Sequence, residues 1–330
     1  MTTAIPVQFL PDGAIGRSLD RRMRIELANS LRHIAKSATG EFDLPDGFDA
    51  AIATIEGERP IEPLAFAAYY RATQALLDEN VPDGLAHLRF LVGHCRPFER
   101  LETAAFDGSS PLGWMFDYYA ACLDTDPTMS FGIKPAAGAT AAAGLDNVLA
   151  GLDLLRRGAP EIAAEFLAIV HQLVLLEPTD PKARYNFDGG SSYQLWGALA
   201  LNVEKPKPVV SMAETIAHES AHSFLFGHTI DEALVNNPDD ELFRSPLRPD
   251  PRPMDGIYHA TFVTARMHYA LDRLIGWGGL SAEDREVAAA ERASDAQKFR
   301  DGLAVVDASA DLSPTGRALL RSAAGYMAGD

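Results

Sequence analysis

Two histidines and a glutamate stand close together in the sequence His218-Glu219-Ser220-Ala221-His222. Histidines four residues apart lie one turn apart on the same face of an α-helix, so both imidazoles can reach one metal ion. Glu219 points about 100° away from that face, where its carboxylate can act on a metal-bound water or support a ligand. The pattern therefore predicts a metal centre with His218 and His222 as ligands and Glu219 as the catalytic carboxylate, although ordinary helical histidines also produce this spacing by chance.

The residues around the motif favour a helix over about 212–226. Ser211 followed by Glu214 matches a capping box, and Gly227 is a common helix terminator. Apolar residues on the side away from the histidines would bury the helix. The motif is thus expected to lie on a zincin-like helix.

Two histidines seldom complete a metal site, so a third ligand is expected. His228 lies ten residues after His218, but the glycine of the extended metalloprotease motif is two positions late, and His228 would need an abrupt turn. Glu241 belongs to an acidic run that is typical of solvated loops, and Asp231 and Glu232 match no pattern.

His259 is the remaining candidate and the one we favour as the third metal ligand. It stands near the start of a predicted helix that Asp255 is placed to cap. The following residues Phe262, Val263 and Arg266 form an apolar surface with one cation, which suits a pocket better than open solvent.

The composition disfavours two classes of partner, nucleic acids and anionic membranes. The formal net charge of −17 disfavours binding to nucleic acid or to anionic membranes. The two cysteines, Cys95 and Cys122, form no Cys-x-x-Cys pair, which is typical of buried thiols in a reducing compartment. The first residues lack a secretory signal, and no apolar run reaches the roughly 18 residues of a membrane helix. We expect a soluble, cytoplasmic protein.

Hydrophobic periodicity predicts a mainly α protein with a small β component and one short sheet (α+β). Helices are expected over 18–38, 62–79, 84–94, 112–123, 145–176, 212–226, 256–275, 282–299 and 313–327, with one strand over 193–203. Residues 125–144 are interpreted as a linker or an insertion. This predicts either a helical region over 1–130 followed by a metal-binding catalytic region over 131–330, or one continuous domain that contains both. The proline-rich segment 236–253 is a candidate active-site wall.

Three parts of the chain together resemble one known family: the histidine motif, the segment Phe243 to Pro253 and the segment Gly256 to His259. The family is that of the bacterial HExxH-motif peptide-modification proteins, which are 2-oxoglutarate-dependent peptide β-hydroxylases. The resemblance covers roughly Gly189 to Arg273, and the first half of the chain adds little to it.

The resemblance implies iron(II) bound by His218, His222 and His259, or with Glu219 as a ligand instead. It implies 2-oxoglutarate as co-substrate and hydroxylation at a β-carbon of a residue in a ribosomally synthesised precursor peptide. The distal carboxylate of 2-oxoglutarate needs a cation, for which Arg252 and Arg266 are the candidates, although surface salt bridges are an equally good interpretation of both.

Two other functions remain open at this stage. In a zinc metallopeptidase, Glu219 would activate a zinc-bound water as general base. In an inactive metal- or peptide-binding module, the motif would bind metal without turnover. The sequence gives no oligomeric state.

Overall fold

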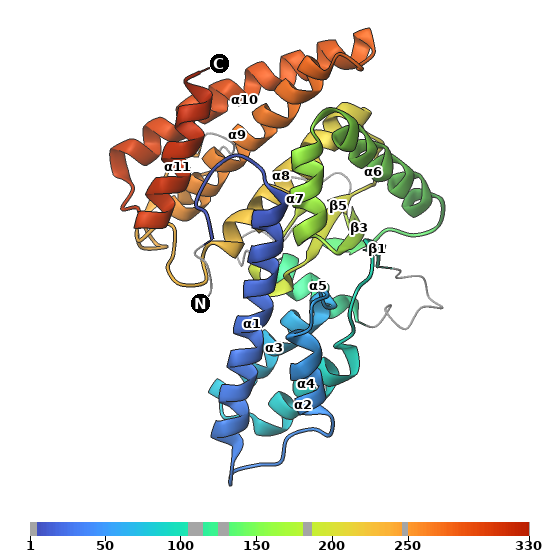
Figure 1. The fold of residues 1–330 in the computed structure, drawn as a ribbon, viewed down its shortest axis with the longest axis vertical. Coiled ribbons are helices and arrows are strands. Elements are labelled where there is room, and N and C mark those ends of the chain that lie inside the picture. Colours follow the sequence, from blue (N-terminus) through green and yellow to red (C-terminus); the bar gives the residue numbers. More distant parts are fainter. Residues whose placement is uncertain (1–4, 105–114, 125–131, 181–186, 246–249, 330) are drawn as a thin grey trace. The chain divides into compact units, whose positions relative to one another are not determined.

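The computed structural model describes residues 5–104, 115–124, 132–180, 187–245 and 250–329. These residues form eleven α-helices, one short 3-10 helix (η1, Tyr193–Leu195) and seven strands (Figure 1). The predicted class, mainly α with a small β component, is confirmed. Among the described helices, none combines the length and the apolar character that crossing a membrane requires.

The helices are α1 (Gly13–Ala38), α2 (Phe48–Ile55), α3 (Pro63–Leu77), α4 (Val81–His94), α5 (Phe116–Leu123), α6 (Gly138–Gly158), α7 (Pro160–Ile169), α8 (Val209–Gly227), α9 (Met254–Trp277), α10 (Ala282–Ser309) and α11 (Pro314–Met327). The strands are β1 (Glu102–Thr103), β2 (Ile133–Pro135), β3 (Gln172–Pro178), β4 (Gly189–Gly190), β5 (Ala198–Asn202), β6 (Leu242–Phe243) and β7 (Arg252–Pro253).

The chain divides into two compact units, each assembled from separate stretches. Unit 1 consists of Met1–Gly16, Asp146–Phe166 and Pro206–Asp330, and unit 2 consists of Arg17–Leu145 and Leu167–Lys205. The chain passes between the units four times, and three of these passages fall inside α1, α6 and α7. This division differs from the predicted cut near residue 130, because periodicity identifies elements but does not show which distant stretches pack together.

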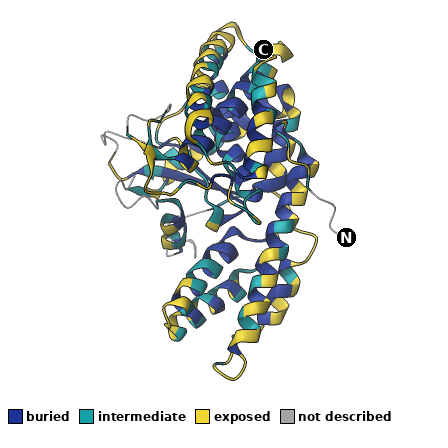
Figure 2. Ribbon diagram, turned by 90° about the vertical axis from the view of Figure 1, so that its left-hand side faces the viewer, coloured by how far each residue is buried: buried dark blue, intermediate teal, exposed yellow. Residues whose placement is uncertain are grey.

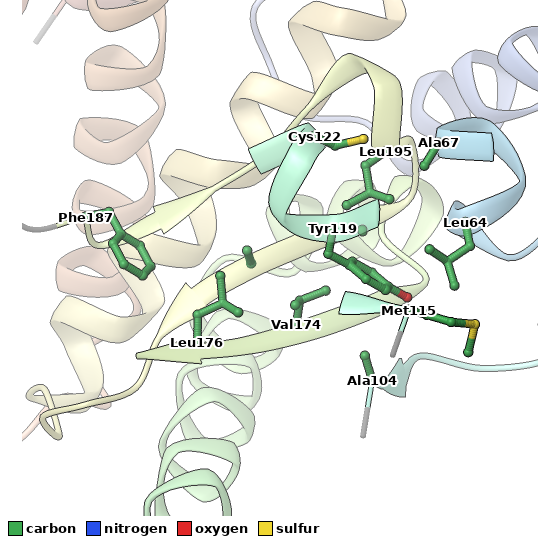
Figure 3. Packing of buried hydrophobic residues seen from close by; sticks show 12 residues of the cluster. Leu64, Ala67, Ala104, Met115, Tyr119, Cys122, Val174, Leu176, Phe187 and Leu195 are labelled. Atoms are coloured by element: carbon green, nitrogen blue, oxygen red, sulfur yellow. The ribbon is translucent and has the colours of Figure 1, made fainter. Parts of the chain in front are cut away.

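Unit 2 contains a five-stranded mixed sheet built around β3. This strand pairs in parallel with β1 and β5 and antiparallel with β2, and β4 pairs antiparallel with β5. Both central strands are almost wholly buried (Figure 2). Residues of α3, α5 and the sheet form a common core (Figure 3). At this core the Tyr119 hydroxyl donates to Oε1 of Gln172 at 2.7 Å.

Strand β3 corrects the predicted helix over 145–176. Helices α6 and α7 end at Gly158 and Ile169, and the chain then continues as β3. Its four consecutive apolar residues, 173–176, are buried on both faces, and such a run has the same hydrophobic pattern as a buried helix. The helical prediction therefore extended too far.

Other predicted elements match in part. The strand expected over 193–203 is confined to β5, after η1 and Gly197, whose positive φ of 90° turns the chain into the strand. Of the linker expected over 125–144, residues 125–131 lie outside the described residues, and the rest forms β2 and the start of α6. The segment 236–253 carries the antiparallel pair β6 and β7, and its residues 246–249 are likewise outside the described part.

Unit 1 is a helical assembly in which α8 packs against α9, and both contact α10. Aromatic rings fill its centre. Phe262 lies parallel to Phe224 at 5.9 Å, and Phe9 meets Phe262 edge-on at 5.6 Å. The backbone N–H of Phe9 also donates to Oγ of Ser322 at 2.9 Å, so the N-terminal segment is part of this core.

Candidate metal centre

Helix α8, which carries the histidine motif, begins earlier than predicted. It starts at Val209, after Pro208, and ends at Gly227 as expected. The predicted capping box does not form, because Ser211 and Glu214 both turn toward α10: the Ser211 hydroxyl donates to Oε1 of Glu291 at 2.7 Å. The motif nevertheless lies well inside a helix.

An accessible stripe runs along α8. After Ser211, all residues of the helix are buried except His218, His222 and Phe226. Residues at intervals of four share one helical face, so the two histidines and Phe226 line the same side of an otherwise buried helix. Any ligand of α8 must therefore approach along this stripe.

The two motif histidines direct their Nε2 atoms toward each other. These atoms are 3.2 Å apart, and the ring centroids are 4.9 Å apart with planes inclined by 64°. Two imidazole nitrogens bound to one ion at about 2.0–2.1 Å lie roughly 2.8–3.4 Å apart in octahedral or tetrahedral geometry. The observed separation fits two ligands of one metal.

His259 comes from α9 and lies beside His222. Its Nδ1 is 3.0 Å from Nδ1 of His222, and the two rings are nearly parallel, at 15° and 5.3 Å. The ring of Phe226 lies 5.3 Å from that of His259. The structure thus brings together the three predicted histidines, but His222 meets His218 and His259 with opposite nitrogens.

Glu219 lies beside the first histidine of the pair. Its carboxylate is buried, and Oε1 is 3.9 Å from Nε2 of His218. Two ligand sets follow from these positions. One consists of His218, His222 and Glu219, which is a two-histidine, one-carboxylate set; the other consists of three histidines and requires His259 to turn toward the Nε2 pair.

The third donor is not yet in place in either set. Within the described ranges, no group of three or more His, Cys, Asp or Glu side chains has its donor atoms gathered around one point for a metal ion. The contacts show a facing pair of Nε2 atoms on His218 and His222, with His259 and Glu219 as the two neighbouring candidates for a third ligand.

Burial makes the central imidazoles neutral. It is the largest influence that lowers the pKa of His222, and the neighbouring His218 and His259 lower it further. Burial also lowers the pKa of His259, against the opposing charge of Asp255. Because a neutral imidazole keeps a lone pair for a metal, both rings are prepared for ligation at neutral pH.

The other predicted third ligands have contacts elsewhere. His228 caps the end of α8 and packs edge-on against Phe224 at 4.8 Å. Glu232 accepts the backbone N–H of Thr315 at 3.0 Å, and Glu241 accepts from the Asn237 side chain at 3.2 Å. Asp231 is exposed on the segment after α8. None of these contacts involves the three clustered histidines.

Arg266 forms a buried ion pair with Glu165. Their side chains are 3% and 2% exposed, and Nη1 of Arg266 lies 2.6 Å from Oε1 of Glu165. The guanidinium also lies over the rings of Phe9, Phe224 and Phe262 at 4.6–5.5 Å. These contacts assign Arg266 to the core of unit 1 and do not support the predicted co-substrate role, because a buried guanidinium paired in this way is already engaged.

Arg252 is more accessible. It lies on β7, its side chain is 23% exposed, and its Nε is 2.7 Å from Oδ2 of Asp250. Arg244 is exposed next to β6, and Arg248 lies outside the described residues. The role predicted for Arg252 in binding 2-oxoglutarate stays a prediction, and its side chain is paired with Asp250.

Two residues contact the histidines but are not among the site residues predicted from the sequence. Phe226 covers His222 and His259, and the Met267 sulfur is 3.1 Å from Nδ1 of His218. Periodicity could have identified both, because Phe226 follows His222 by four residues and Met267 follows His259 by eight. Neither residue type is a usual metal ligand at such a site.

A group of buried carboxylates joins α8 to α10 one turn before the motif. Glu214 is hydrogen-bonded to Asp295, and Lys298 approaches Oδ1 of Asp295 at 3.4 Å. Burial, followed by the negative charges of Asp295 and Glu291, raises the pKa of Glu214 to about 10. Glu214 is thus a neutral acid at neutral pH.

We expect Glu214→Gln to flatten the dependence of stability on pH. The folded chain holds this proton and the unfolded chain, with the usual carboxyl pKa of 4.5, releases it, so wild-type stability falls as pH rises from about 4.5 to about 10. Glutamine mimics the protonated acid and removes this slope, which for one proton is at most about 1.4 kcal/mol per pH unit. Urea unfolding at several pH values between about 6 and 9 measures it. Glu283→Gln, at an exposed glutamate of α10, is the control; parallel curves for wild type and Glu214→Gln would contradict the assignment.

A scan of protein-family models and a search of curated proteins found no match to the chain.

Proposed function

We propose that the chain is an iron(II)- and 2-oxoglutarate-dependent hydroxylase that acts at a β-carbon of a residue in a ribosomally synthesised peptide. The observation that carries the metal centre is the pair of Nε2 atoms of His218 and His222, 3.2 Å apart on the accessible stripe of a buried helix. The reaction class comes from the resemblance of this region to the HExxH-motif peptide β-hydroxylases.

The chain's own residues would hold the iron from one side. His218 and His222 would bind through Nε2, and Glu219 or His259 would supply the third ligand. A site with three protein ligands leaves positions for a bidentate 2-oxo acid and for dioxygen. When bound, iron(II) supplies the chemistry by which dioxygen and 2-oxoglutarate convert a C–H bond to C–OH, with release of succinate and carbon dioxide.

The neighbouring side chains prepare the site for this chemistry. The lowered pKa values of half-buried His222 and buried His259 keep both rings neutral, so each ring has one nitrogen with a lone pair, and the single proton of His222 would reside on Nδ1 when Nε2 binds the metal. Phe226 forms an apolar wall beside both rings and limits the access of water. Arg252 would bind the distal carboxylate of 2-oxoglutarate in place of its present partner Asp250.

One observation favours a second candidate, a zinc metallopeptidase. The buried carboxylate of Glu219 faces Nε2 of His218 at 3.9 Å, a position from which a general base could take a proton from a water at the site. In that case zinc would be the metal, and the Glu219 carboxylate would be needed for cleavage of a peptide bond.

An anaerobic titration tests the oxygenase. We expect the purified chain, loaded with iron(II), to develop a visible charge-transfer band when 2-oxoglutarate is added. In air, a precursor peptide encoded beside the enzyme should gain the mass of one oxygen, and 2-oxoglutarate should be consumed. His218→Ala and His222→Ala should abolish the band, whereas His94→Ala, in unit 2, should not.

The rival functions give different results in the same assay. Peptide fragments that depend on zinc and disappear in Glu219→Gln would establish the peptidase. Metal binding with neither fragments nor an oxygen adduct would support a binding module. Loss of both the band and 2-oxoglutarate turnover from folded, iron-loaded protein would rule out the oxygenase.

The proposed setting is cytoplasmic, because ribosomal precursor peptides are made there and iron(II) persists in a reducing compartment. The net charge of −17 makes a peptide with basic or neutral residues a better partner than an acidic one.

A further inference from the structure

Met267 lies on α9 two turns beyond His259 and faces the first motif histidine across the helix pair. Its sulfur is 3.1 Å from Nδ1 of His218, while His259 contacts His222. Helices α8 and α9 are therefore joined by two side-chain contacts near the motif, one from His218 to Met267 and one from His222 to His259. The thioether lies on the side of His218 opposite to the Nε2 pair.

The thioether restricts the proton positions on His218. A methionine sulfur has no hydrogen to donate and can only accept, and a neutral imidazole carries one N–H. A hydrogen bond between the two groups therefore requires the proton to be on Nδ1. Nε2 of His218 is then left with its lone pair directed at His222.

The proton position on His218 also determines those on His222 and His259. If His218 accepts at Nε2, His222 donates from its own Nε2 and accepts at Nδ1 from Nδ1–H of His259. Each ring then carries one proton and all three are neutral. Because the Met267 sulfur can only accept, it sets which nitrogen donates and which accepts in each hydrogen bond between the three rings.

We propose that Met267 is a positioning residue that fixes the Nδ1–H tautomer and the ring orientation of His218, so that Nε2 is presented to the metal. The role rests on the metal centre proposed above. Metal-binding histidines usually donate their second N–H to a carboxylate, a carbonyl or water. A thioether is a weaker acceptor, so it orients the ring while adding little negative charge to it.

The test compares Met267→Leu, which removes the acceptor at similar volume, with Met267→Gln, which restores one as an amide oxygen. Nitrogen NMR of metal-free, histidine-labelled protein reads the tautomer, with the His218 signals assigned from the His218→Ala spectrum. We expect Nδ1–H in the wild type, loss of this preference in Met267→Leu, and its return in Met267→Gln. Co(II) affinity should fall about 10- to 100-fold in Met267→Leu and recover largely in Met267→Gln.

Met327→Leu, a half-buried methionine at the end of α11, is the matched control and should change neither quantity. An Nε2–H tautomer in wild-type protein, or unchanged tautomer and Co(II) affinity in Met267→Leu, would overturn the role of Met267. If His218→Ala retains full Co(II) affinity, the metal centre itself fails, and this outcome is separate from the tautomer result. Circular dichroism of each variant establishes that it is folded, and Met267→Gln serves as the test if Met267→Leu is not.

Discussion

Replacing His222 with alanine is expected to weaken iron(II) binding by more than about 100-fold, which exceeds the 10- to 100-fold losses seen when a residue only supports a ligand. His222 is the middle ring of the cluster, 3.2 Å from His218 through Nε2 and 3.0 Å from His259 through Nδ1. Its removal would take away one proposed metal ligand and also the ring that contacts both His218 and His259. Anaerobic titration followed by metal analysis measures the loss.

The matched control is His94→Ala. The His94 side chain is 27% exposed, close to the 26% of His218, but it stacks on Phe90 in unit 2. It should leave iron(II) affinity unchanged. Equal affinity for wild type and His222→Ala would remove the basis for a metal centre on α8.

The same titration decides the third ligand. If His259 completes the site, His259→Ala should lower the affinity as strongly as His222→Ala, and Glu219→Gln should lower it little. If Glu219 is the ligand, the order of the two variants is reversed. The positions of His259, beside Nδ1 of His222, and of Glu219, beside Nε2 of His218, make these alternatives separable.

Arg266→Met should destabilise the folded chain by about 3–5 kcal/mol, because removing one partner leaves a buried charge without compensation. Burial is the largest influence on Glu165 and raises its pKa, while Arg266 holds the pKa down. Without the guanidinium, Glu165 should keep a proton in the folded state to still higher pH. The unfolded chain releases that proton near the usual value of 4.5, so the stability of Arg266→Met should fall as pH rises above it.

Urea unfolding of three variants checks this prediction. The double variant Glu165→Gln with Arg266→Met contains no buried charge at this place and should lose much less stability than Arg266→Met alone. Arg273→Met, which breaks a half-exposed pair with Glu161, should cost about 0–1 kcal/mol. Unchanged stability of Arg266→Met, combined with weaker 2-oxoglutarate binding, would return Arg266 to the co-substrate role.

The motif helix and the class of the fold could be predicted because their signals are local. His218 and His222 need only helical spacing, and His259 stands in a helix whose apolar face is visible in the sequence. The capping box failed for a different reason: Ser211 and Glu214 satisfy the local rule, but tertiary partners on α10 engage both side chains. Local capping chemistry cannot anticipate such partners.

The environment of Arg266 and the division into two units depend on contacts between segments that are far apart in the sequence. The sequence makes Arg266 a candidate for binding 2-oxoglutarate or for a surface salt bridge, whereas it forms a buried ion pair with Glu165, which is 101 positions away in the sequence. The strand β3 was hidden because burial of both faces removes the alternation that marks a strand. Both differences come from packing between segments whose proximity periodicity does not encode.

The participation of Phe9 in the core of unit 1 has a practical consequence for dissecting the protein. Its ring meets Phe262 edge-on, and the backbone N–H of Asp12 donates to the buried Glu165, so the segment from Phe9 to Asp12 belongs to the same interior as Phe224 of the histidine helix. A fragment that begins at residue 131 would expose Phe262 and leave Glu165 with fewer donors, although it contains every candidate ligand. Deletions that remove Phe9 and Asp12 are therefore expected to perturb the interior around the histidine helix, although these residues lie more than two hundred positions before the motif.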